Sequence, residues 1–279
     1  MPSKIGVIFC CYGNPEYVEP CLKPWLALKD KYNIKIAGVH GQFKEFNEKD
    51  GLHYDNDHET LDLLEEKYYF KDLIDYLYIQ NRYDDLGTGC LIHYGTEAEI
   101  RNYGLEYLLK ENVEFVLMLD NDEIYTEQEI ENLISYINKE DNQFYAVFKI
   151  EFKNLTFSDK TYTKGFCPQR IWRVDLGDYR LSEVNYDNDC LYEHKLTGAN
   201  KSDKEFSNKS IPKNLVNPIH HSWDDYERSS KKIIYQLKRW SPPNGNGCSF
   251  KINEEKKCIE WDMEYFNRIG QTPPIIFEL

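Results

Sequence analysis

Short apolar runs alternate with helical patterns in the first half of the chain. Four runs of four to six residues predict buried strands: Ile5–Phe9, Ile34–Val39, Tyr76–Ile79 and Phe115–Leu119. Each run is too short for a helix and is bounded by polar or turn-forming residues, which is typical of strands in a parallel sheet. Apolar positions at helical spacing predict helices at about residues 16–30, 61–70, 96–110 and 126–139.

This alternation predicts an α/β fold with a mainly parallel sheet flanked by helices. Ligands of such sheets bind at the C-terminal ends of the strands. The pattern then changes, because extended segments at 145–152, 162–165 and 169–174 follow one another without helices between them. The stretch 197–215 is rich in Lys, Ser and Asn and is predicted to be a surface loop.

The last third of the chain lacks the alternation of apolar runs and helical patterns. A helix is predicted at about 223–240, and the segment Pro242–Gly247 breaks the chain after it. We therefore expect one domain over residues 1–222 and an irregular C-terminal extension over residues 223–279 that packs on it.

Composition excludes two classes of protein. The chain has 279 residues, of which 41% are hydrophobic and 15% aromatic, so a disordered protein is excluded. It carries 34 Lys and Arg against 48 Asp and Glu, a net charge of −14. Proteins bind duplex DNA largely through contacts of Lys and Arg side chains with the backbone phosphates. Because acidic residues are in excess here, we expect no nucleic acid partner.

Three features predict a cytoplasmic protein. No stretch approaches the roughly 18 consecutive apolar residues of a membrane span, so no integral membrane segment is expected. The N-terminus lacks the apolar core and cleavage site of a signal peptide. The eight cysteines include no Cys-x-x-Cys pair and read as reduced thiols rather than as a disulfide framework.

The main chemical signal is Asp120-Asn121-Asp122, directly after the apolar run that ends at Leu119. Two carboxylates one residue apart at a strand end can meet one hard cation from the same side. Oxygen ligands of this kind suit Mg²⁺ or Mn²⁺, which leave coordination positions for substrate phosphates. The alternative is an acidic turn that only caps the next helix.

These motifs resemble glycosyltransferases of the GT-A fold, a Rossmann-like architecture, and in particular the large inverting family 2. The resemblance covers roughly residues 3–240. The first strand, Lys4–Tyr12, stands where that family begins. Glu97–Gly104 resembles the family's helix with an Arg-Asn-x-Gly element, and Phe115–Glu123 resembles its Asp-x-Asp motif.

The resemblance implies that Asp120 and Asp122 bind a nucleotide-sugar diphosphate through a divalent metal, Asp122 directly. It places the nucleoside at the ends of the first two strands. The residues that it assigns to this donor pocket are Cys11, Tyr12, Gln42, Arg101, Asn102 and Asp120. The chain departs from the family after the first strand, where Cys-Cys-Tyr-Gly-Asn replaces the usual Thr-x-Asn.

Three later segments parallel those of some bacterial and prophage members of the family. They are Gln169–Arg173, the pair Glu193-His194 and Ile219–Trp223. The resemblance places His220 at the position of a late histidine that commonly completes the metal site, and His221 follows it. A neutral imidazole suits Mn²⁺ better than Mg²⁺, so manganese is the expected metal. The alternative is that the two histidines form a polar strand end.

An inverting transfer needs a carboxylate that removes a proton from the acceptor hydroxyl. It also needs stabilisation of the leaving diphosphate, which the metal supplies. Glu193 is the first candidate base, because it falls at the position of the family's glutamate, and Asp189 is the second. Each of them can also be a solvated acid. Further candidates are Asp187 and Glu183 as bases, and Arg170, Arg173, Lys231 and Lys232 as phosphate partners.

The sequence thus predicts a metal-dependent hexosyltransferase that moves a sugar from a nucleotide donor, UDP-linked, to a carbohydrate hydroxyl with inversion. The expected partners are this donor and a glycan acceptor. The alternative is a catalytically inactive GT-A domain that binds a carbohydrate or another partner. A haloacid-dehalogenase-type phosphatase fits less well, because three strands precede the Asp-x-Asp motif. A sugar nucleotidyltransferase fits less well because Cys10–Gly13 is not a Gly-rich loop with an arginine.

Overall fold

The protein is described from a computed structural model. The described residues are 3–11, 13–41, 58–79, 97–142, 145–156, 160–162, 167–174, 179–184, 193–198, 208–223, 250–253, 258–261, 263–268 and 277–278. The chain divides into two compact units. The first comprises residues 1–44, 54–151 and 167–218, and the second residues 45–53, 152–166 and 219–279. Each unit is described by itself.

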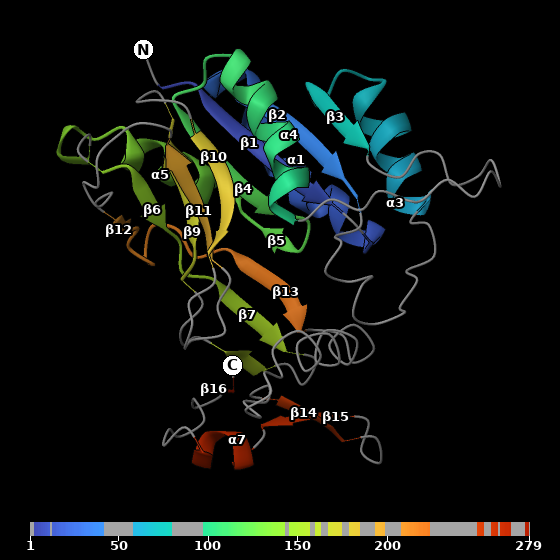
Figure 1. Ribbon diagram of the computed structural model, residues 1–279, viewed down its shortest axis with the longest axis vertical. Coiled ribbons are helices and arrows are strands. Elements are labelled where there is room, and N and C mark those ends of the chain that lie inside the picture. Colours follow the sequence, from blue (N-terminus) through green and yellow to red (C-terminus); the bar gives the residue numbers. More distant parts are fainter. Residues whose placement is uncertain are drawn as a thin grey trace. The chain divides into compact units, whose positions relative to one another are not determined.

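The first unit contains a seven-stranded sheet with the order β12-β6-β9-β4-β1-β2-β3 (Figure 1). Its parallel half consists of the four strands that the apolar runs predict: β1 (Ile5–Cys11), β2 (Lys35–His40), β3 (Tyr76–Ile79) and β4 (Phe115–Asp120). Strand β1 lies in the middle, parallel to both β2 and β4. The carboxyl ends of these strands therefore lie along one edge of the sheet.

Beyond β4 the sheet becomes mixed. The added strands are β9 (Gln169–Arg173), β6 (Val147–Lys149) and β12 (Asn208–Ser210). Strand β9 runs antiparallel to both β4 and β6, and β12 is parallel to β6. Strand β12 lies within the stretch that was predicted to be a surface loop, so that prediction is wrong for these residues. Their pairing with β6 is a tertiary contact, which a local excess of polar residues does not reveal.

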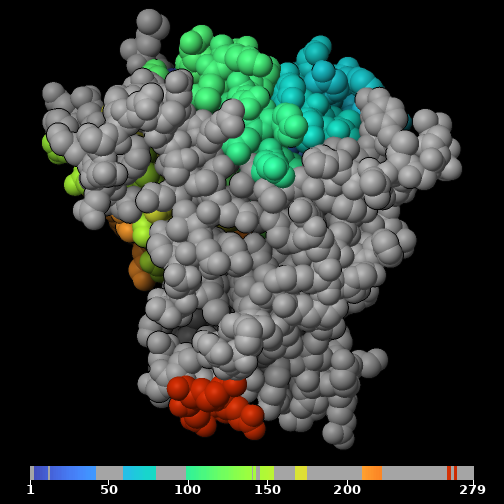
Figure 2. Space-filling model, viewed as in Figure 1, coloured from blue at the N-terminus to red at the C-terminus, as the bar shows by residue number. Residues whose placement is uncertain are grey.

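Helices flank the sheet of the first unit. They are α1 (Pro15–Tyr32), α3 (His58–Asp62), the π-helix η1 (Leu63–Tyr69), α4 (Glu97–Lys110) and α5 (Glu127–Ile137). In Figure 1, α4 lies in front of the sheet, and α1 and α5 contact each other. Figure 2 shows α4 in green beside the cyan η1–β3 segment at the surface. The large exposed hydrophobic residues there are Tyr69, Phe70, Leu73 and Tyr103.

Local sequence signals explain where two of the helices begin. Thr126 accepts a hydrogen bond from the Glu129 N–H at 3.2 Å, and the Glu129 carboxylate accepts one from the Thr126 N–H at 2.9 Å. The two hydrogen bonds form a capping box at the start of α5. Helix α1 begins with Pro15 and continues through Pro20 and Pro24. Its buried stripe is Val18, Cys21, Leu22, Trp25 and Leu28, whose burial offsets the cost of the prolines.

The first unit also holds a hairpin and a short strand near the sheet. Strands β10 (Tyr179–Val184) and β11 (Glu193–Gly198) pair antiparallel, and β10 contacts α4. The two-residue strand β5 (Glu123–Ile124) follows β4 after a turn.

The second unit contains short strands and one helix. Strands β16 (Phe277–Glu278), β8 (Lys160–Tyr162), β7 (Lys153–Thr156) and β13 (Ile219–Trp223) lie side by side in this order. Strands β14 (Phe250–Asn253) and β15 (Cys258–Trp261) form an antiparallel pair, and α7 comprises Met263–Arg268. Residues 152–166 thus group with the C-terminal part of the chain. The predicted helix at 223–240 lies outside the described residues, and the boundary at residue 222 stays a prediction.

Within the described part of the chain, no helix has both the length and the apolar character that a membrane crossing requires.

Candidate active site at the end of strand β4

The acidic turn follows β4 where the parallel strands end. Strand β4 is buried from Phe115 to Leu119 and emerges at the half-buried Asp120. Asp120 pairs in register with Cys10 of β1, and Cys11 pairs with His40 of β2. The ends of β1, β2 and β4 therefore meet at the acidic turn, which is where ligands of parallel sheets bind.

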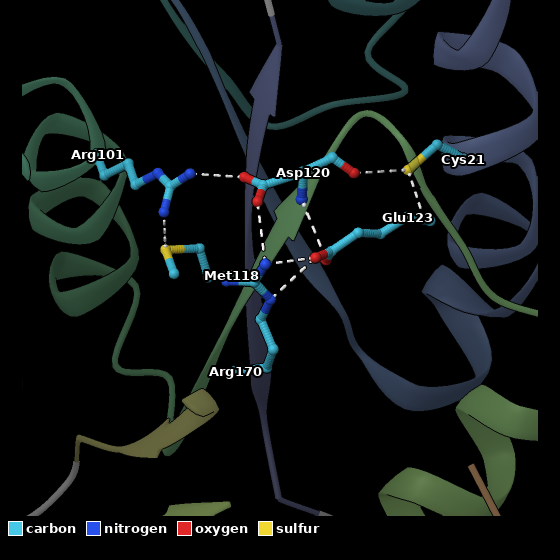
Figure 3. A network of polar contacts seen from close by, with 6 residues as sticks. All are labelled: Cys21, Arg101, Met118, Asp120, Glu123 and Arg170. Carbon is cyan, nitrogen blue, oxygen red and sulfur yellow. Dashed lines mark hydrogen bonds and ion pairs between the residues drawn. The ribbon is translucent and has the colours of Figure 1, made fainter. Parts of the chain in front are cut away.

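Two buried arginines bind the carboxylate of Asp120 (Figure 3). Arg101 of α4 donates from Nη2 to Oδ1 at 2.6 Å, and Arg170 of β9 donates from Nη2 to Oδ2 at 3.1 Å. The two arginine side chains are 3% and 7% exposed, respectively. Such charge-assisted hydrogen bonds are stronger than neutral ones, so the orientation of Asp120 is held by the protein itself.

Arg170 also binds Glu123, which lies at the other end of the turn. Its Nε donates to Glu123 Oε1 at 3.0 Å, and its Nη2 makes a second contact with the same oxygen. The Asp120 N–H points to Glu123 Oε2 at 3.4 Å. Complete burial raises the pKa of Glu123; neighbouring Asp120 and Asp122 push it in the same direction, and Arg170 opposes them.

The backbone of the turn is held from two further sides. The Asn121 side chain donates to the Gly13 carbonyl at 2.7 Å, and its backbone N–H donates to the Cys10 carbonyl at 3.1 Å. The Cys21 thiol of α1 donates to the Glu123 carbonyl at 3.1 Å and lies 3.5 Å from the Asp120 carbonyl oxygen. Burial raises the pKa of the Cys21 thiol, so this group stays a protonated donor.

The structure brings several of the predicted donor-pocket residues together. Cys11 is buried at the end of β1, and the Asn121 amide lies 3.5 Å from its sulfur. Arg101 reaches Asp120, and the half-buried Asn102 follows it on α4. Tyr12 and Gln42 lie outside the described residues.

The predicted base and histidine ligands stay predictions. Glu193 is the first residue of β11, where it pairs with Val184, and its side chain lies outside the described part of the structure. Asp189 lies outside the described residues altogether. His220 and His221 belong to β13 of the second unit, where the His220 ring lies 5.9 Å from that of Phe152.

The turn carries carboxylate oxygens, which are the type of donor that hard cations bind. Among the residues that the structure describes, no three His, Cys, Asp or Glu side chains lie together as a metal-binding group. Both oxygens of Asp120 accept hydrogen bonds from guanidinium groups. Mg²⁺ in phosphate-transfer sites is held by one or two carboxylates together with substrate phosphates. Asp122, the second carboxylate of the motif, is half-buried in the same turn.

Three solved structures of S. aureus TarS resemble the chain. TarS itself has 16% identity and a TM-score of 0.37 over 61% of this chain and 28% of that chain. TarS 1–349 has 15% identity and a TM-score of 0.46 over 91% and 77% of the two chains. TarS 1–349 in complex with UDP-GlcNAc has 17% identity and a TM-score of 0.38 over 61% and 45%. No protein-family model and no curated protein matches the chain.

The strand order decides the fold class. Four parallel strands in the order β4-β1-β2-β3, helices beside them and an antiparallel β9 next to β4 make a mainly parallel, mixed sheet of Rossmann-like type. In this sheet the Asp-x-Asp turn follows β4, as the sequence predicts.

The sequence predicts Arg170 as a phosphate partner, but the structure places its guanidinium on Asp120 and Glu123. Glu123 is a site residue that the sequence analysis does not predict. The available signal is that Arg170 directly precedes Ile171 and Trp172 in a short strand that is buried, and a buried arginine requires an acidic partner.

Proposed function

We propose that this chain is a metal-dependent glycosyltransferase that moves a sugar from a UDP-linked donor to a carbohydrate hydroxyl, with inversion. The observation that carries the proposal is the acidic turn from Asp120 to Asp122 at the joint ends of β1, β2 and β4. Carboxylates at this edge of a parallel sheet suit a cation that neutralises the phosphates of a nucleotide.

The two aspartates have different roles in this proposal. Asp122 holds Mn²⁺ or Mg²⁺ together with the diphosphate of the donor, and a histidine from His220 or His221 would favour manganese. When bound, the metal stabilises the negative charge of the leaving diphosphate. Asp120 accepts hydrogen bonds from Arg101 and Arg170 and keeps the turn in place.

Other residues bind the donor and activate the acceptor. The nucleoside lies against Cys11, Tyr12, Gln42, Arg101 and Asn102. Support comes from the position of Cys11 beside Asn121 and of Arg101 on Asp120. Glu193, or else Asp189, removes the proton from the acceptor hydroxyl as that oxygen attacks the anomeric carbon. A cytoplasmic location agrees with the described cysteines Cys10, Cys11, Cys21 and Cys167, which are thiols and not disulfides.

Slow hydrolysis of UDP-sugars tests the proposal without knowledge of the acceptor. A panel of UDP-sugars is incubated with wild type, Asp122→Ala and the exposed control Asp141→Ala, with Mn²⁺ or with EDTA. We expect Mn²⁺-dependent hydrolysis by wild type and by the control, and a loss of about a hundredfold or more in Asp122→Ala. Turnover by Asp122→Ala at the wild-type rate contradicts the metal assignment. If the protein binds a UDP-sugar or a glycan but turns over no donor, even when glycan acceptors are present, an inactive binding module is favoured.

The identity of the base has its own test. Once an acceptor is found, transfer by Glu193→Gln and Asp189→Asn is compared with that of wild type. We expect loss of transfer in Glu193→Gln. Retained transfer in that variant, together with loss in Asp189→Asn, assigns the base to Asp189.

A further inference from the structure

One guanidinium joins the two ends of the acidic turn. Arg170 contacts Asp120, the last residue of β4, and Glu123, the first residue of β5. Because these two acids are three positions apart and flank Asp122, the arginine spans the segment that presents Asp122. Figure 3 shows Arg170 pointing at both carboxylates from below, whereas Arg101 approaches Asp120 from the left.

Burial makes these contacts depend on one another. Glu123 is fully buried, and Arg170 retains 7% of its side-chain exposure. A buried charge whose partner is removed is strongly destabilised. Without Arg170, Asp120 and Glu123 lose the guanidinium that contacts both of them, so it no longer joins the two ends of the turn. Without the charge of Glu123, Arg170 still has Asp120 as its partner.

The contacts also require an arginine. Nε and Nη2 of Arg170 both reach Glu123 Oε1, and Nη2 also reaches Asp120 Oδ2. A guanidinium presents donors in a planar fork, whereas lysine offers one compact ammonium group. A lysine at this position would keep the charge but lose the simultaneous contact with both acids.

From this geometry we infer that Arg170 and Glu123 are a positioning pair that holds the Asp120–Glu123 turn in the form in which Asp122 takes the cation and diphosphate. This inference rests on the proposed function. Arg170 and Glu123 would affect that function indirectly, through the conformation of the turn that carries Asp122. Neither side chain exposes enough surface to bind the nucleotide itself. The pair therefore sets the affinity for a nucleoside diphosphate with its cation through the shape of the turn.

The first measurement is the affinity for UDP with Mn²⁺, by isothermal titration calorimetry. The variants are Arg170→Met, Arg170→Lys, Glu123→Gln and the double variant Arg170→Met/Glu123→Gln. The matched control is Lys35→Met, since Lys35 also lies on a strand of the sheet, at the amino end of β2, and forms an ion pair with Asp75 at 3.1 Å. We expect about a tenfold or greater loss of affinity in Arg170→Met, a smaller loss in Arg170→Lys, and less than about twofold in the control. The double variant should bind UDP more tightly than Arg170→Met, because the buried acid no longer lacks a partner.

The second measurement does not depend on a nucleotide. The Cys21 thiol donates to the carbonyl of Glu123, so its protection reports on the turn. Labelling of Cys21 by iodoacetamide is followed by peptide mass spectrometry in each variant, with melting temperature measured in parallel. We expect Cys21 to react faster in Arg170→Met and at the wild-type rate in Lys35→Met, at temperatures where both variants are folded. If Arg170→Met does not fold, Arg170→Lys and Glu123→Gln carry both measurements.

The outcomes separate the inference from the proposed function. Suppose that wild type binds UDP with Mn²⁺ and the Arg170 variants bind it equally well. The positioning role is then wrong and the proposed function stands. The same holds if the Arg170 variants lose affinity only in proportion to a loss of melting temperature that Lys35→Met shares. If wild type binds no nucleoside diphosphate with either metal, the proposed function fails and this inference fails with it.

Discussion

Replacement of Gly104 by alanine tests how closely α4 must approach the sheet. A Cβ at this position would lie 3.1 Å from Val39 Cγ1, 3.2 Å from Ile8 Cγ2 and 3.6 Å from Ala37 Cβ. Carbon atoms in ordinary contact are about 3.5–4.0 Å apart. The first two contacts are therefore too short by a few tenths of an ångström, and α4 or the strands must shift.

Two opposing effects determine the change in stability. Alanine is favoured over glycine within a helix by about 1 kcal/mol. An extra methyl group in a well-packed core costs about 1–3 kcal/mol. Val39 and Ile8 are fully buried and β-branched, so their side chains have few other rotamers with which to relieve the contact. We therefore expect Gly104→Ala to lower the free energy of unfolding by about 1 kcal/mol, and Gly104→Val by more.

Urea denaturation of Gly104→Ala, with Glu106→Ala as the control, measures this balance. Glu106 is exposed on the same helix, so its replacement leaves the helix–sheet contact unchanged. A displaced α4 would also lengthen the 2.6 Å contact from Arg101 to Asp120, so we expect weaker binding of UDP with Mn²⁺ in Gly104→Ala. An increase in stability of Gly104→Ala would show that the core accepts the methyl group and would refute the close-packing explanation of this glycine.

Three further predictions concern stability. Thr126→Ala removes the capping box of α5 and should lower the free energy of unfolding in urea by about 1 kcal/mol; no change would mean that the cap contributes nothing. Phe148→Ala empties a fully buried site between aromatic rings and should cost about 3–5 kcal/mol, which thermal unfolding measures; a change below about 1 kcal/mol contradicts this packing. For Asp75, burial favours a higher pKa, but the Ile36 N–H and two lysines outweigh it and hold the pKa below its ordinary value. The stability from these contacts is present above about pH 4 and is lost as the pH falls further, so Asp75→Asn should show a flatter decline in acid than wild type.

Local sequence patterns predict most of the parallel half of the fold. The four apolar runs become β1 to β4, and the helix predicted at about 126–139 becomes α5. These signals are contained within a few neighbouring residues. The order of the strands β9, β6 and β12 does not depend on such local signals. Strand β9 inserts between β4 and β6 through contacts between segments that are distant in the sequence. No local pattern carries that information, which is why β12 was predicted to be a loop.

Part of the candidate site can also be predicted from local sequence, and part of it cannot. The Asp-x-Asp motif follows a buried strand, so its place at the sheet edge could be predicted from the sequence. The partners of Asp120 could not, because Arg101 is 19 positions away and Arg170 is 50 positions away, on elements that only the folded sheet brings together. Glu123 was missed because an acid beside two others resembles a solvated cluster, whereas the fold buries it against an arginine.

The central claim is that the acidic turn takes a divalent cation together with a nucleotide diphosphate, through Asp122. Its most direct test is an anomalous difference map at the manganese absorption edge, from crystals of the protein grown with Mn²⁺ and UDP. The account predicts a manganese peak in coordination contact with the Asp122 carboxylate and with diphosphate oxygens. Bound UDP with no metal peak at that carboxylate, or with the metal held elsewhere, would contradict it.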